Sequence, residues 1–442
     1  MSNNLINKHK EHDVIIIGGG ISGCALLYLL SRYTSVQNIA LFEKYPVIAS
    51  VNTHARNNSQ TLHCGDIETN YTLEKARQVK QTANMVVKYA EQHAITKGIL
   101  FKYPKMVIAV GAECPSLQSR YEQFKPHFPN MQLLHTDGIK QIEPAVIEGR
   151  KDEISAIAIT DEYTAVNFQE LSQSFVQQAQ KENDQIDIFT NTLVNKIETS
   201  DKGYLVNTSA GQHRARFVVV SAGGHSLLFA HQMGYGKEFS CLPMAGSFYY
   251  TPKVLNGKVY TVQNDKLPFA AIHGDPDVVC PGKTRFGPTA LALPLLERHC
   301  WSTFTESIRV FKPDQDVIKS LWGLVRQKEI RDYMLKNFLF EIPAIRERLF
   351  LKDVRKIVPN LTLKDISFAS NTGGIRPVMI DKKAHKLHLG EAQINPGNGL
   401  IFNMTPSPGA TSCLGNAEKD LRSIIDYLGA DFDEVALAHD LK

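Results

Sequence analysis

The segment DVIIIGGGISGCALLYLL, residues 13–30, constrains the fold more than any other part of the chain. Its first apolar run, VIII, is β-branched and typical of a buried parallel strand. Gly18, Gly20 and Gly23 follow as G-x-G-x-x-G, and the apolar residues after them continue as a helix. A second apolar run, NIALF, is followed by Glu43. Strand, glycine turn, helix, strand and acid in this order indicate a dinucleotide-binding βαβ unit.

The glycine turn predicts a phosphate site. The first glycine permits the tight turn, the second lets the backbone approach a pyrophosphate, and the third lets the helix pack closely on the strand. The N-terminus of the helix then faces the phosphate charge, and the acid after the second strand accepts from a ribose hydroxyl. The predicted contacts are Gly18, Gly20, Ser22 and Gly23 for the pyrophosphate, Glu43 for the adenosine ribose, and Lys44 beside it.

Two later segments favour FAD over a nicotinamide cofactor. ARFVVVSAGGHS (215–226) is a strand that runs into a glycine pair, and NMTPSPGATSCL (403–414) is a Gly/Pro/Thr turn that opens a helix. The position of the glycine motif near the start of the chain is also usual in flavoproteins. A chain that returns twice to an N-terminal nucleotide site suggests a large, fixed cofactor.

Composition argues against several classes of protein. The 442 residues are 43% hydrophobic and 21% charged, which fits a folded protein of two or three domains. A net charge of only +4 does not favour nucleic acid as a partner. Seven cysteines occur without a CxxC pair, so we expect a reducing compartment, no disulfide framework and no metal site. Three glycines interrupt the apolar run near the N-terminus, and no other run reaches the roughly 18 apolar residues of a membrane span.

The rest of the chain alternates between helical and strand-like segments. We expect helices over 73–98, 163–183 and 313–342, a strand over 105–110, short strands over 187–222, and a strand-rich region over 241–292 with a hairpin at Asn256-Gly257. This pattern predicts an α/β fold, in which a Rossmann-like FAD-binding domain is interleaved with a substrate domain of mixed antiparallel sheet and helices. The expected bounds are 1–80, 150–235 and 360–442 for the FAD-binding domain, and 81–149 and 236–359 for the substrate domain.

The stretch NSQTLHCGDIETNYT, residues 58–72, concentrates reactive side chains. His63 stands beside Cys64, with Asp66 and Glu68 close behind. These residues alone fit a metal site, a cysteine nucleophile or a polar loop laid against a cofactor. No partners at metal-ligand spacing occur elsewhere in the chain, and transfer of a hydride to FAD needs no bond to sulfur. We therefore expect a loop that contacts the flavin.

Six segments together resemble a known family: IIGGGISGCA (16–25), NNSQTLHCGDIETNYT (57–72), VSAGGHS (220–226), PFAAIHGDPD…GKTRFGPTA (268–290), GGIRP (373–377) and FNMTPSPGATSC (402–413). The set resembles the D-amino-acid-oxidase-like flavoproteins, including L-2-hydroxyglutarate oxidase. It is most similar to the FAD-dependent malate:quinone oxidoreductases, over nearly the whole chain. The resemblance implies bound FAD, oxidation of malate to oxaloacetate, and transfer of the electrons to membrane quinone. Related enzymes acting on lactate, L-2-hydroxyglutarate or an amine, and a flavin-binding protein without catalysis, remain alternatives.

The resemblance also implies which residues carry the chemistry. Oxidation of a 2-hydroxyacid needs a base for the hydroxyl proton and cations for the carboxylates. His273 is the favoured base, because FAAIH suggests a strand that delivers its last residue to the domain interface; His63 is the alternative and His225 a poorer candidate. Arg376 and Arg285 are the expected carboxylate ligands. Further substrate contacts are assigned to Gln60, Thr61 and Ser247, and further FAD contacts to Asn58, Ser59, Val194, Gly223, Gly409, Ala410 and Thr411.

Residues 301–360 are the expected membrane-docking part of the substrate domain. They hold twelve Lys and Arg against eight Asp and Glu, together with both tryptophans, Trp301 and Trp322. Basic residues interleaved with aromatic ones suit an anionic membrane surface. A helix that packs Trp322 into the core with its charged face in water is the competing interpretation. The resemblance implies a cytoplasmic protein held peripherally on the inner face of the cell membrane.

Overall fold

The computed structural model describes residues 10–263, 271–388, 390–406 and 408–442. Its first sheet has the order β21-β22-β11-β1-β2-β8, and β1 pairs in parallel with both of its neighbours. A hairpin, β9–β10, continues from β11. The strands are β1 (Lys10–Ile17), β2 (Ile39–Phe42), β8 (Ile186–Phe189), β9 (Val194–Ser200), β10 (Gly203–Thr208), β11 (Gly211–Val220), β21 (Ala392–Ile394) and β22 (Leu400–Met404).

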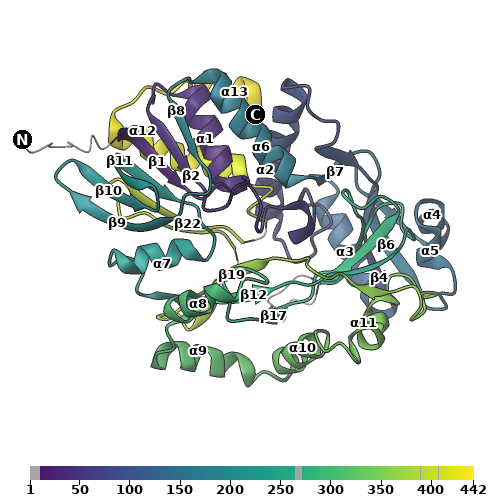
Figure 1. Ribbon diagram of the computed structural model, residues 1–442. Coiled ribbons are helices and arrows are strands. Elements are labelled where there is room, and N and C mark those ends of the chain that lie inside the picture. Colours follow the sequence, from purple (N-terminus) through teal and green to yellow (C-terminus); the bar gives the residue numbers. More distant parts are fainter. Residues whose placement is uncertain (1–9, 264–270, 389, 407) are drawn as a thin grey trace, which may run out of the picture.

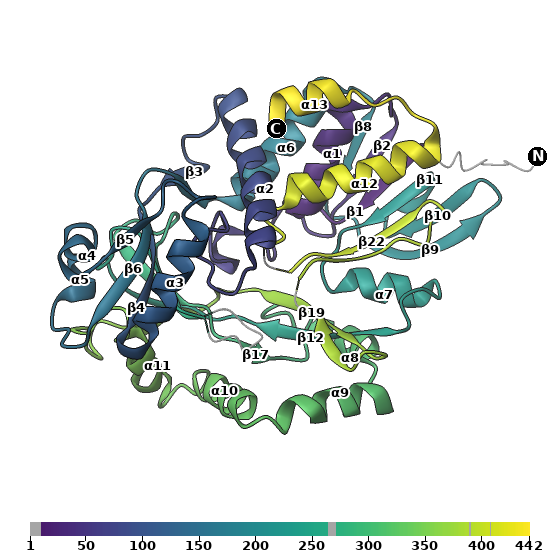
Figure 2. The same ribbon diagram turned by 180° about the vertical axis from the view of Figure 1, so that it is seen from behind.

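Helices cover one face of this sheet, and the β9–β10 hairpin lies on its other side together with α7 (His225–Gln232) (Figures 1 and 2). The covering helices are α1 (Ile21–Tyr33), α2 (Leu73–Gln92), α6 (Phe168–Glu182), α12 (Cys413–Leu428) and α13 (Glu434–Leu441). The apolar residues of β1 alternate between the two sides: Val14 and Ile16 pack with the helices, and Ile15 and Ile17 pack on the α7 side. A parallel strand buried on both faces needs apolar residues throughout, which explains the VIII run.

The second part of the molecule contains an eight-stranded and a four-stranded sheet. The larger has the order β18 (Ser367–Phe368), β13 (Tyr249–Pro252), β16 (Lys283–Gly287), β15 (His273–Pro276), β14 (Lys258–Thr261), β4 (Lys105–Val110), β6 (Ile154–Ile159) and β5 (Gln132–Leu134). The smaller has the order β17 (Leu291–Ala292), β12 (Phe239–Ala245), β19 (Ile375–Asp381) and β20 (Lys386–His388). The helices here are α3 (Cys114–Phe124), α4 (Thr136–Ile142), α5 (Pro144–Ile147), α8 (Phe304–Phe311), α9 (Gln315–Val325), α10 (Lys328–Leu339) and α11 (Arg346–Val354).

The predicted α/β fold with a Rossmann-like sheet is confirmed, and so are the strand at 105–110 and the short strands within 187–222. Three element predictions are wrong. Residues 163–166 form the strand β7 (Tyr163–Val166), which pairs with β3 (Leu100–Lys102). The helix begins only at Phe168, because Asn167 caps it by accepting the Glu170 N–H. The helix expected over 313–342 is two helices, because Gln327 is extended between α9 and α10. The helix expected over 73–98 ends at Gln92.

The hairpin predicted at Asn256-Gly257 is also wrong. The strand before it, β13, pairs with β16 and β18, whereas the strand after it, β14, pairs with β4 and β15. The buried carboxylate of Glu143 accepts the N–H groups of Asn256 at 2.9 Å and Gly257 at 2.5 Å. A Cβ on Gly257 would lie 1.9 Å from the Pro104 carbonyl oxygen. The glycine therefore serves a close backbone contact rather than a two-residue turn.

Candidate active site

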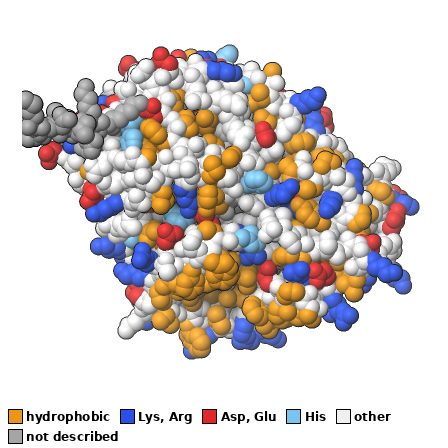
Figure 3. Space-filling model, in the orientation of Figure 1, with side chains coloured by type: hydrophobic (Ala, Val, Ile, Leu, Met, Phe, Trp, Pro, Cys, Tyr) orange, Lys and Arg blue, Asp and Glu red, His pale blue; other side chains and the backbone are white. Residues whose placement is uncertain are grey.

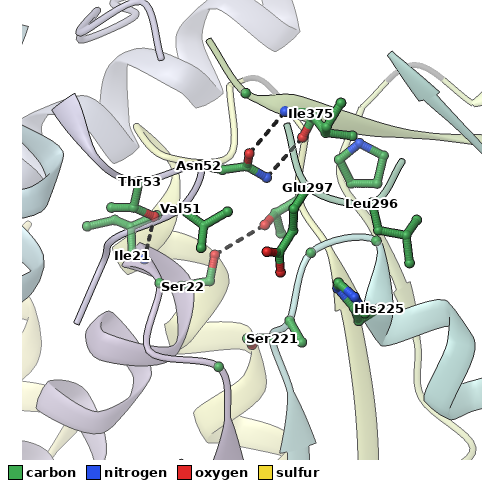
Figure 4. A pocket seen from close by; sticks show the side chains of 18 of the residues that line it. Ile21, Ser22, Val51, Asn52, Thr53, Ser221, His225, Leu296, Glu297 and Ile375 are labelled. Atoms are coloured by element: carbon green, nitrogen blue, oxygen red, sulfur yellow. Dashed lines mark hydrogen bonds between the residues drawn. The ribbon is translucent and has the colours of Figure 1, made fainter. Parts of the chain in front are cut away.

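A cavity of about 470 Å³ lies at the carboxyl ends of β1, β2, β11 and β22, facing β12 and β19 (Figure 4). This is where open α/β sheets bind nucleotides. Its wall is built from the glycine turn, the loop over 49–63, the start of β9, and residues of the segments 221–225, 246–248, 374–377, 405–406 and 408–411. The last residues of β1 and β2, Ile17 and Phe42, and the residues that directly follow β11 and β22, Ser221 and Thr405, thus meet at one site.

The glycine turn fits a bound pyrophosphate. Gly18 has a φ of +109°, and a Cβ there would lie 2.5 Å from the Ser221 carbonyl oxygen. A Cβ on Gly23 would lie 2.1 Å from the Gly18 carbonyl oxygen, so this residue serves helix–strand packing, and it lies outside the cavity lining. At Gly20 a Cβ would meet only Thr53 Oγ1, at 3.3 Å, which leaves its cavity side open. The N-cap residue of α1, Gly20, has no capping side chain, and Thr53 Oγ1 accepts only the Ile21 N–H, so the helix N-terminus can receive an anion.

The residues after β2 line the end of the cavity at which the adenosine ribose is expected. Glu43 accepts the N–H groups of Gly19 and Tyr45, each at 2.9 Å, and burial raises its pKa. Both of its oxygens keep a second lone pair for a ribose hydroxyl. Lys44 lines the cavity and pairs with Glu297. Val194, the first residue of β9, lines the same end, as the resemblance implied.

Asparagine side chains hold the loop over 49–60 in place. Asn52 accepts from the Ile375 N–H at 3.0 Å and donates to its carbonyl at 2.9 Å, which ties the loop to β19 (Figure 4). Asn58 Nδ2 donates to three carbonyls between 52 and 54, and its Oδ1 accepts the Gln60 N–H. Asn58 and Ser59 line the cavity. Gly374 is required beside Asn52, because a Cβ there would lie 2.8 Å from its Oδ1.

The turn before α12 closes the cavity on another side. Ser22 and Thr405 share a hydrogen bond of 3.2 Å across it. Ala410 and Thr411 line the cavity, as does Gly223 on the opposite wall. Gly409 does not, and its N–H already donates to the Pro406 carbonyl. The Thr411 N–H likewise donates to a carbonyl of its own turn, so the predicted flavin donors at 409 and 411 are engaged within the protein.

His63 lies on the cavity wall with a carboxylate behind it. Its ring Nδ1 is 2.9 Å from Glu68 Oε1, and its backbone N–H donates to Thr411 Oγ1 at 3.1 Å. Burial would raise the pKa of Glu68, but the hydrogen bond and charge of His63 bring it below its ordinary value. A carboxylate on one ring nitrogen orients the imidazole, so this pair can act as a general base.

Arg376 also lines the cavity. It lies on β19 opposite Met244, with Nη2 3.7 Å from the position of a Cβ on Gly246. Among the described residues no carboxylate pairs with its half-buried guanidinium, and burial lowers its pKa. A guanidinium without an internal partner on a cavity wall is suited to a ligand carboxylate.

The other predicted substrate residues lie behind the wall. Arg285 is fully buried, 3.7 Å from Asp277 and 4.4 Å from the centre of the Phe248 ring, and its three guanidinium nitrogens have no hydrogen-bond partner in the described part of the chain. Phe248 itself lines the cavity. Ser247 Oγ donates to Glu341 at 2.7 Å, and Gln60 Nε2 donates to the Ala55 carbonyl at 2.9 Å. Thr61 does line the cavity, and its hydroxyl bonds to Tyr260 at 2.9 Å.

His273 is buried outside the cavity lining. Its ring stacks on Tyr260 with centres 4.4 Å apart, and Nε2 lies 3.3 Å from Asp275 Oδ2. Burial would raise the pKa of Asp275, but Lys258 and then His273 bring it far below its ordinary value. Phe269 and Ala270 of the expected FAAIH strand lie outside the described residues, and β15 begins at His273 itself. His273 therefore remains a prediction as the base.

Cys64, Asp66 and Glu162 come within 4.8 Å of one another, at metal-ligand spacing. The ammonium of Lys105 lies among them, 2.8 Å from Asp66 and 3.4 Å from Glu162. Burial would lower the pKa of Lys105, but Asp66 raises it well above its ordinary value. The carboxylates are thus neutralised by lysine, and burial raises the pKa of the Cys64 thiol to about 12. This cluster carries no metal site or nucleophile.

Sequence reasoning missed several residues of the cavity. Thr53 accepts the Ile21 N–H at 3.1 Å, and Asn52 clamps β19 (Figure 4). Arg309 was also missed; it lines the cavity together with Glu306, which pairs at 3.0 Å with His225, the poorer base candidate of the sequence analysis. The Asn- and Thr-rich run VNTHARNNS was a usable signal, because such side chains hold turns. Arg309 had none, because only the tertiary fold brings α8 to the cavity.

Comparison with known proteins agrees with this geometry. The model of the FAD-dependent oxidoreductase family matches residues 13–419. A probable malate:quinone oxidoreductase of Campylobacter jejuni is 48% identical over 98% of this chain and 99% of its own length. The malate:quinone oxidoreductase of Helicobacter pylori is 46% identical over 96% of each. The chain belongs to the malate:quinone oxidoreductase family.

Members of this family are FAD-dependent oxidoreductases, so FAD is the cofactor for which the glycine turn and the cavity are built. Among solved structures, an FAD-bound L-α-glycerophosphate oxidase of Mycoplasma pneumoniae aligns with a TM-score of 0.63. It is 20% identical over 94% of this chain and 95% of its own, a likeness that shows the shared fold. The predicted family, cofactor and enzyme class are thereby confirmed. The individual site residues remain predictions.

Proposed function

We propose that this protein oxidises (S)-malate to oxaloacetate in the cavity and passes the electrons to a membrane quinone. One observation carries the proposal: a single cavity is lined by the nucleotide-binding turn, by His63 with Glu68 behind it, and by Arg376, which has no carboxylate partner among the described residues. Bound FAD supplies the acceptor for the C2 hydride and returns two electrons to the quinone. The residues of this chain hold the carboxylates and take the hydroxyl proton.

Arg376 and a histidine divide these two tasks. The fork of Arg376 holds one malate carboxylate in bidentate fashion, which fixes the orientation of the C2–H bond. Arg285 is proposed for the second carboxylate, because its buried nitrogens find no hydrogen-bond partner among the residues that the structure describes and it stacks on the cavity residue Phe248. Its access to the cavity requires that Phe248 move. Gln60, Thr61 and Ser247 then act mainly by holding the wall, given their internal hydrogen bonds.

The base is proposed to be one of two histidine–carboxylate pairs. His63 with Glu68 reaches the cavity wall, whereas His273 with Asp275 is covered by Tyr260. This contrast favours His63 over the expectation from sequence. The deciding experiment compares His63→Gln with His273→Gln by the rate of anaerobic flavin bleaching by malate. Loss of a general base costs about 10²–10⁴-fold, and the variant that loses this rate while still binding FAD identifies the base.

The test of the function itself is a substrate panel. The purified protein is mixed anaerobically with malate, lactate, L-2-hydroxyglutarate and amino acids, and the loss of flavin absorbance is followed. Malate should bleach the flavin fastest, and reoxidation should require quinone rather than oxygen. Bleaching by another compound but not by malate would assign a related substrate. A protein inert to every compound would favour a non-catalytic flavoprotein.

Contact with the membrane is proposed for the surface of α8, α9 and α10. No helix in the described part of the chain is both long and apolar enough to cross a bilayer. Figure 3 shows hydrophobic side chains gathered at the lower edge of the molecule, where these helices lie in Figure 1. We call this surface the apolar face; its exposed residues are Trp301, Phe304, Ile308, Ile318, Trp322, Leu335 and Phe338. Trp322 is 58% exposed, so the competing interpretation, in which it packs into the core, is wrong.

Charge on the apolar face matches an anionic lipid surface. Lys312, Lys319, Arg326 and Lys328 are exposed around it, and Arg326 lies 5.4 Å from the centre of the Trp322 ring. Exposed tryptophan with basic neighbours is typical of proteins that lie on a bilayer on its cytoplasmic side. Trp322→Glu should weaken sedimentation with anionic vesicles by at least about tenfold. The control is Val435→Glu on α13, at the opposite end of the molecule, which is 81% exposed. Equal binding by both variants would contradict the proposal.

A further inference from the structure

A second, smaller hollow lies between α10 and α11. It has a volume of about 350 Å³. Its lining is apolar at the base and charged at the rim: Leu335, Leu339, Phe340 and Leu349, with Asp332, Lys336, Lys352 and Asp353. We call it the α10–α11 groove. The rim is neutral overall, and Lys336 pairs with Asp353 at 2.6 Å.

The α10–α11 groove opens onto the apolar face. Leu335 belongs to both, and its side chain is 58% exposed. Phe338 follows on the same helix and is 54% exposed. If the apolar face rests on a bilayer, the groove opens toward lipid. A hydrophobic molecule dissolved in that lipid then reaches the groove without crossing water.

The base of the groove is joined to the cofactor cavity through the chain segment 246–249, between β12 and the start of β13. Phe340 lines the groove, and its carbonyl accepts from the Tyr249 hydroxyl at 2.6 Å. The next residue, Glu341, accepts from Ser247 Oγ at 2.7 Å. The two chain neighbours of Ser247, residues 246 and 248, line the cavity. The shortest connection runs from Phe340 through its hydrogen bond to Tyr249 and then through one peptide bond to Phe248 on the cavity wall.

This connection is rigid. Tyr249 stacks on Phe350 with ring centres 3.9 Å apart and an interplanar angle of 11°, and Phe350 meets Phe340 edge-on at 5.1 Å. All three rings are fully or almost fully buried. Arg298 also bonds to both Ser247 and Glu341, at 2.8 and 3.2 Å. The groove is thus held at a fixed distance from the cavity.

We propose that the α10–α11 groove binds the ring of the lipid-soluble quinone. The inference rests on the proposed function, which supplies the reductant. A quinone ring is flat, uncharged and apolar, which suits the leucine and phenylalanine lining. Its two carbonyl oxygens accept hydrogen bonds, and the ammonium groups of Lys336 and Lys352 are donors at the rim. Reduction adds two electrons and two protons, one proton to each carbonyl oxygen. The electrons come from malate by way of FAD, and the protons from water at the open rim.

The primary test locates bound quinone by photo-cross-linking. A short-chain azidoquinone is irradiated with the FAD-loaded protein in the absence of membranes, and labelled peptides are mapped by mass spectrometry. Labelling should fall within α10 and α11. Leu335→Glu should reduce it about tenfold, because the ring would have to desolvate a carboxylate. Ile318→Glu is the matched control, since Ile318 is also 58% exposed on the apolar face but lies outside the groove. Labelling confined to the cavity, or equal loss in both variants, would overturn the proposal.

A second measurement separates this inference from the proposed function. The flavin is reduced with dithionite instead of malate, and its reoxidation by the same short-chain quinone is followed. Leu335→Glu should slow reoxidation about tenfold, while Ile318→Glu should react at the wild-type rate. Malate should bleach both variants normally. If wild-type flavin is bleached by malate but both variants reoxidise normally, the groove is not the quinone site. If malate fails but quinone reoxidation depends on Leu335, the substrate is wrong and the groove is right.

Discussion

Replacing Arg376 by Met should abolish malate binding without destabilising the protein. The two consequences are linked by one structural fact: within the described residues, the guanidinium of Arg376 has no carboxylate partner. Removing it leaves no buried anion behind, and burial already lowers its pKa, which means that the charged form is poorly solvated where it is. Methionine fills the space of the aliphatic stem at little cost in packing.

The size of the binding loss follows from the geometry of a guanidinium and a carboxylate. A charge-assisted hydrogen bond contributes about 1.5–3 kcal/mol, and a bidentate pair makes two. A loss of about 3–5 kcal/mol raises the dissociation constant of malate roughly 10²–10³·⁵-fold. The free energy of unfolding should change by less than about 1 kcal/mol. By contrast, Arg285→Met leaves Asp277 buried without its cation and should cost about 3–5 kcal/mol of stability.

The assay is titration of the flavin absorbance with oxaloacetate or malate, beside thermal unfolding of the same samples. Arg376→Lys should recover part of the affinity, because lysine keeps the charge but not the fork. Weakened binding together with a large fall in melting temperature would mean that Arg376 is structural. Malate binding within about threefold of wild type would refute its role as the carboxylate ligand.

Three further predictions concern the scaffold. Gly23→Ala should lose FAD on gel filtration, because its Cβ would lie 2.1 Å from the Gly18 carbonyl oxygen and push α1 off β1. Lys258→Met should lower the free energy of unfolding in urea by about 3–5 kcal/mol, since it leaves the buried carboxylate of Asp275 without the partner 3.1 Å away. Burial raises the pKa of Glu143 to about 7, so the folded protein holds this proton more tightly than the unfolded chain. Stability should therefore fall by about 3 kcal/mol as the pH rises from about 4.5 to 7, and a Glu143→Gln variant with the same slope would refute this.

The nucleotide half of the fold was predictable because its signals are local. The turn at Gly18 needs a positive φ, the packing at Gly23 needs the absence of a side chain, and VIII needs burial on both faces. Each requirement is met within a few neighbours in the sequence. The helix predicted for residues 163–166 is wrong because a distant part of the chain decides their structure. Their apolar spacing suits a helix, and pairing with β3, about sixty residues earlier in the chain, decides that they form a strand.

The substrate side of the site was only partly predictable. Arg376 lines the cavity beside Gly246, although nothing near GGIRP in the sequence indicates a cavity wall. Position 374, two residues earlier, must be glycine because Asn52 of the loop over 49–60 packs against it. Ser247 illustrates the limit: sequence placed it near the substrate, yet its hydroxyl is turned away toward Glu341 and Arg298. A shift of one residue in an extended segment turns a side chain to the opposite face, and sequence alone does not show which face a given residue takes.

The reactive-looking stretch 58–72 owes its position to a row of buried charges on the facing sheet. Lys258, 1% exposed, donates to Thr61 Oγ1 at 3.1 Å and contacts the Ser59 carbonyl at 3.4 Å. Lys105 holds Asp66 farther along the same stretch. Buried ion pairs add little net stability compared with apolar packing, so stability alone does not account for them. Their directional bonds instead fix the stretch at both ends, and His63 lies between those ends on the cavity wall. Of the two acids that suggested a metal site, Asp66 binds Lys105 and Glu68 binds His63, and the result is a histidine held in one orientation toward the cofactor cavity.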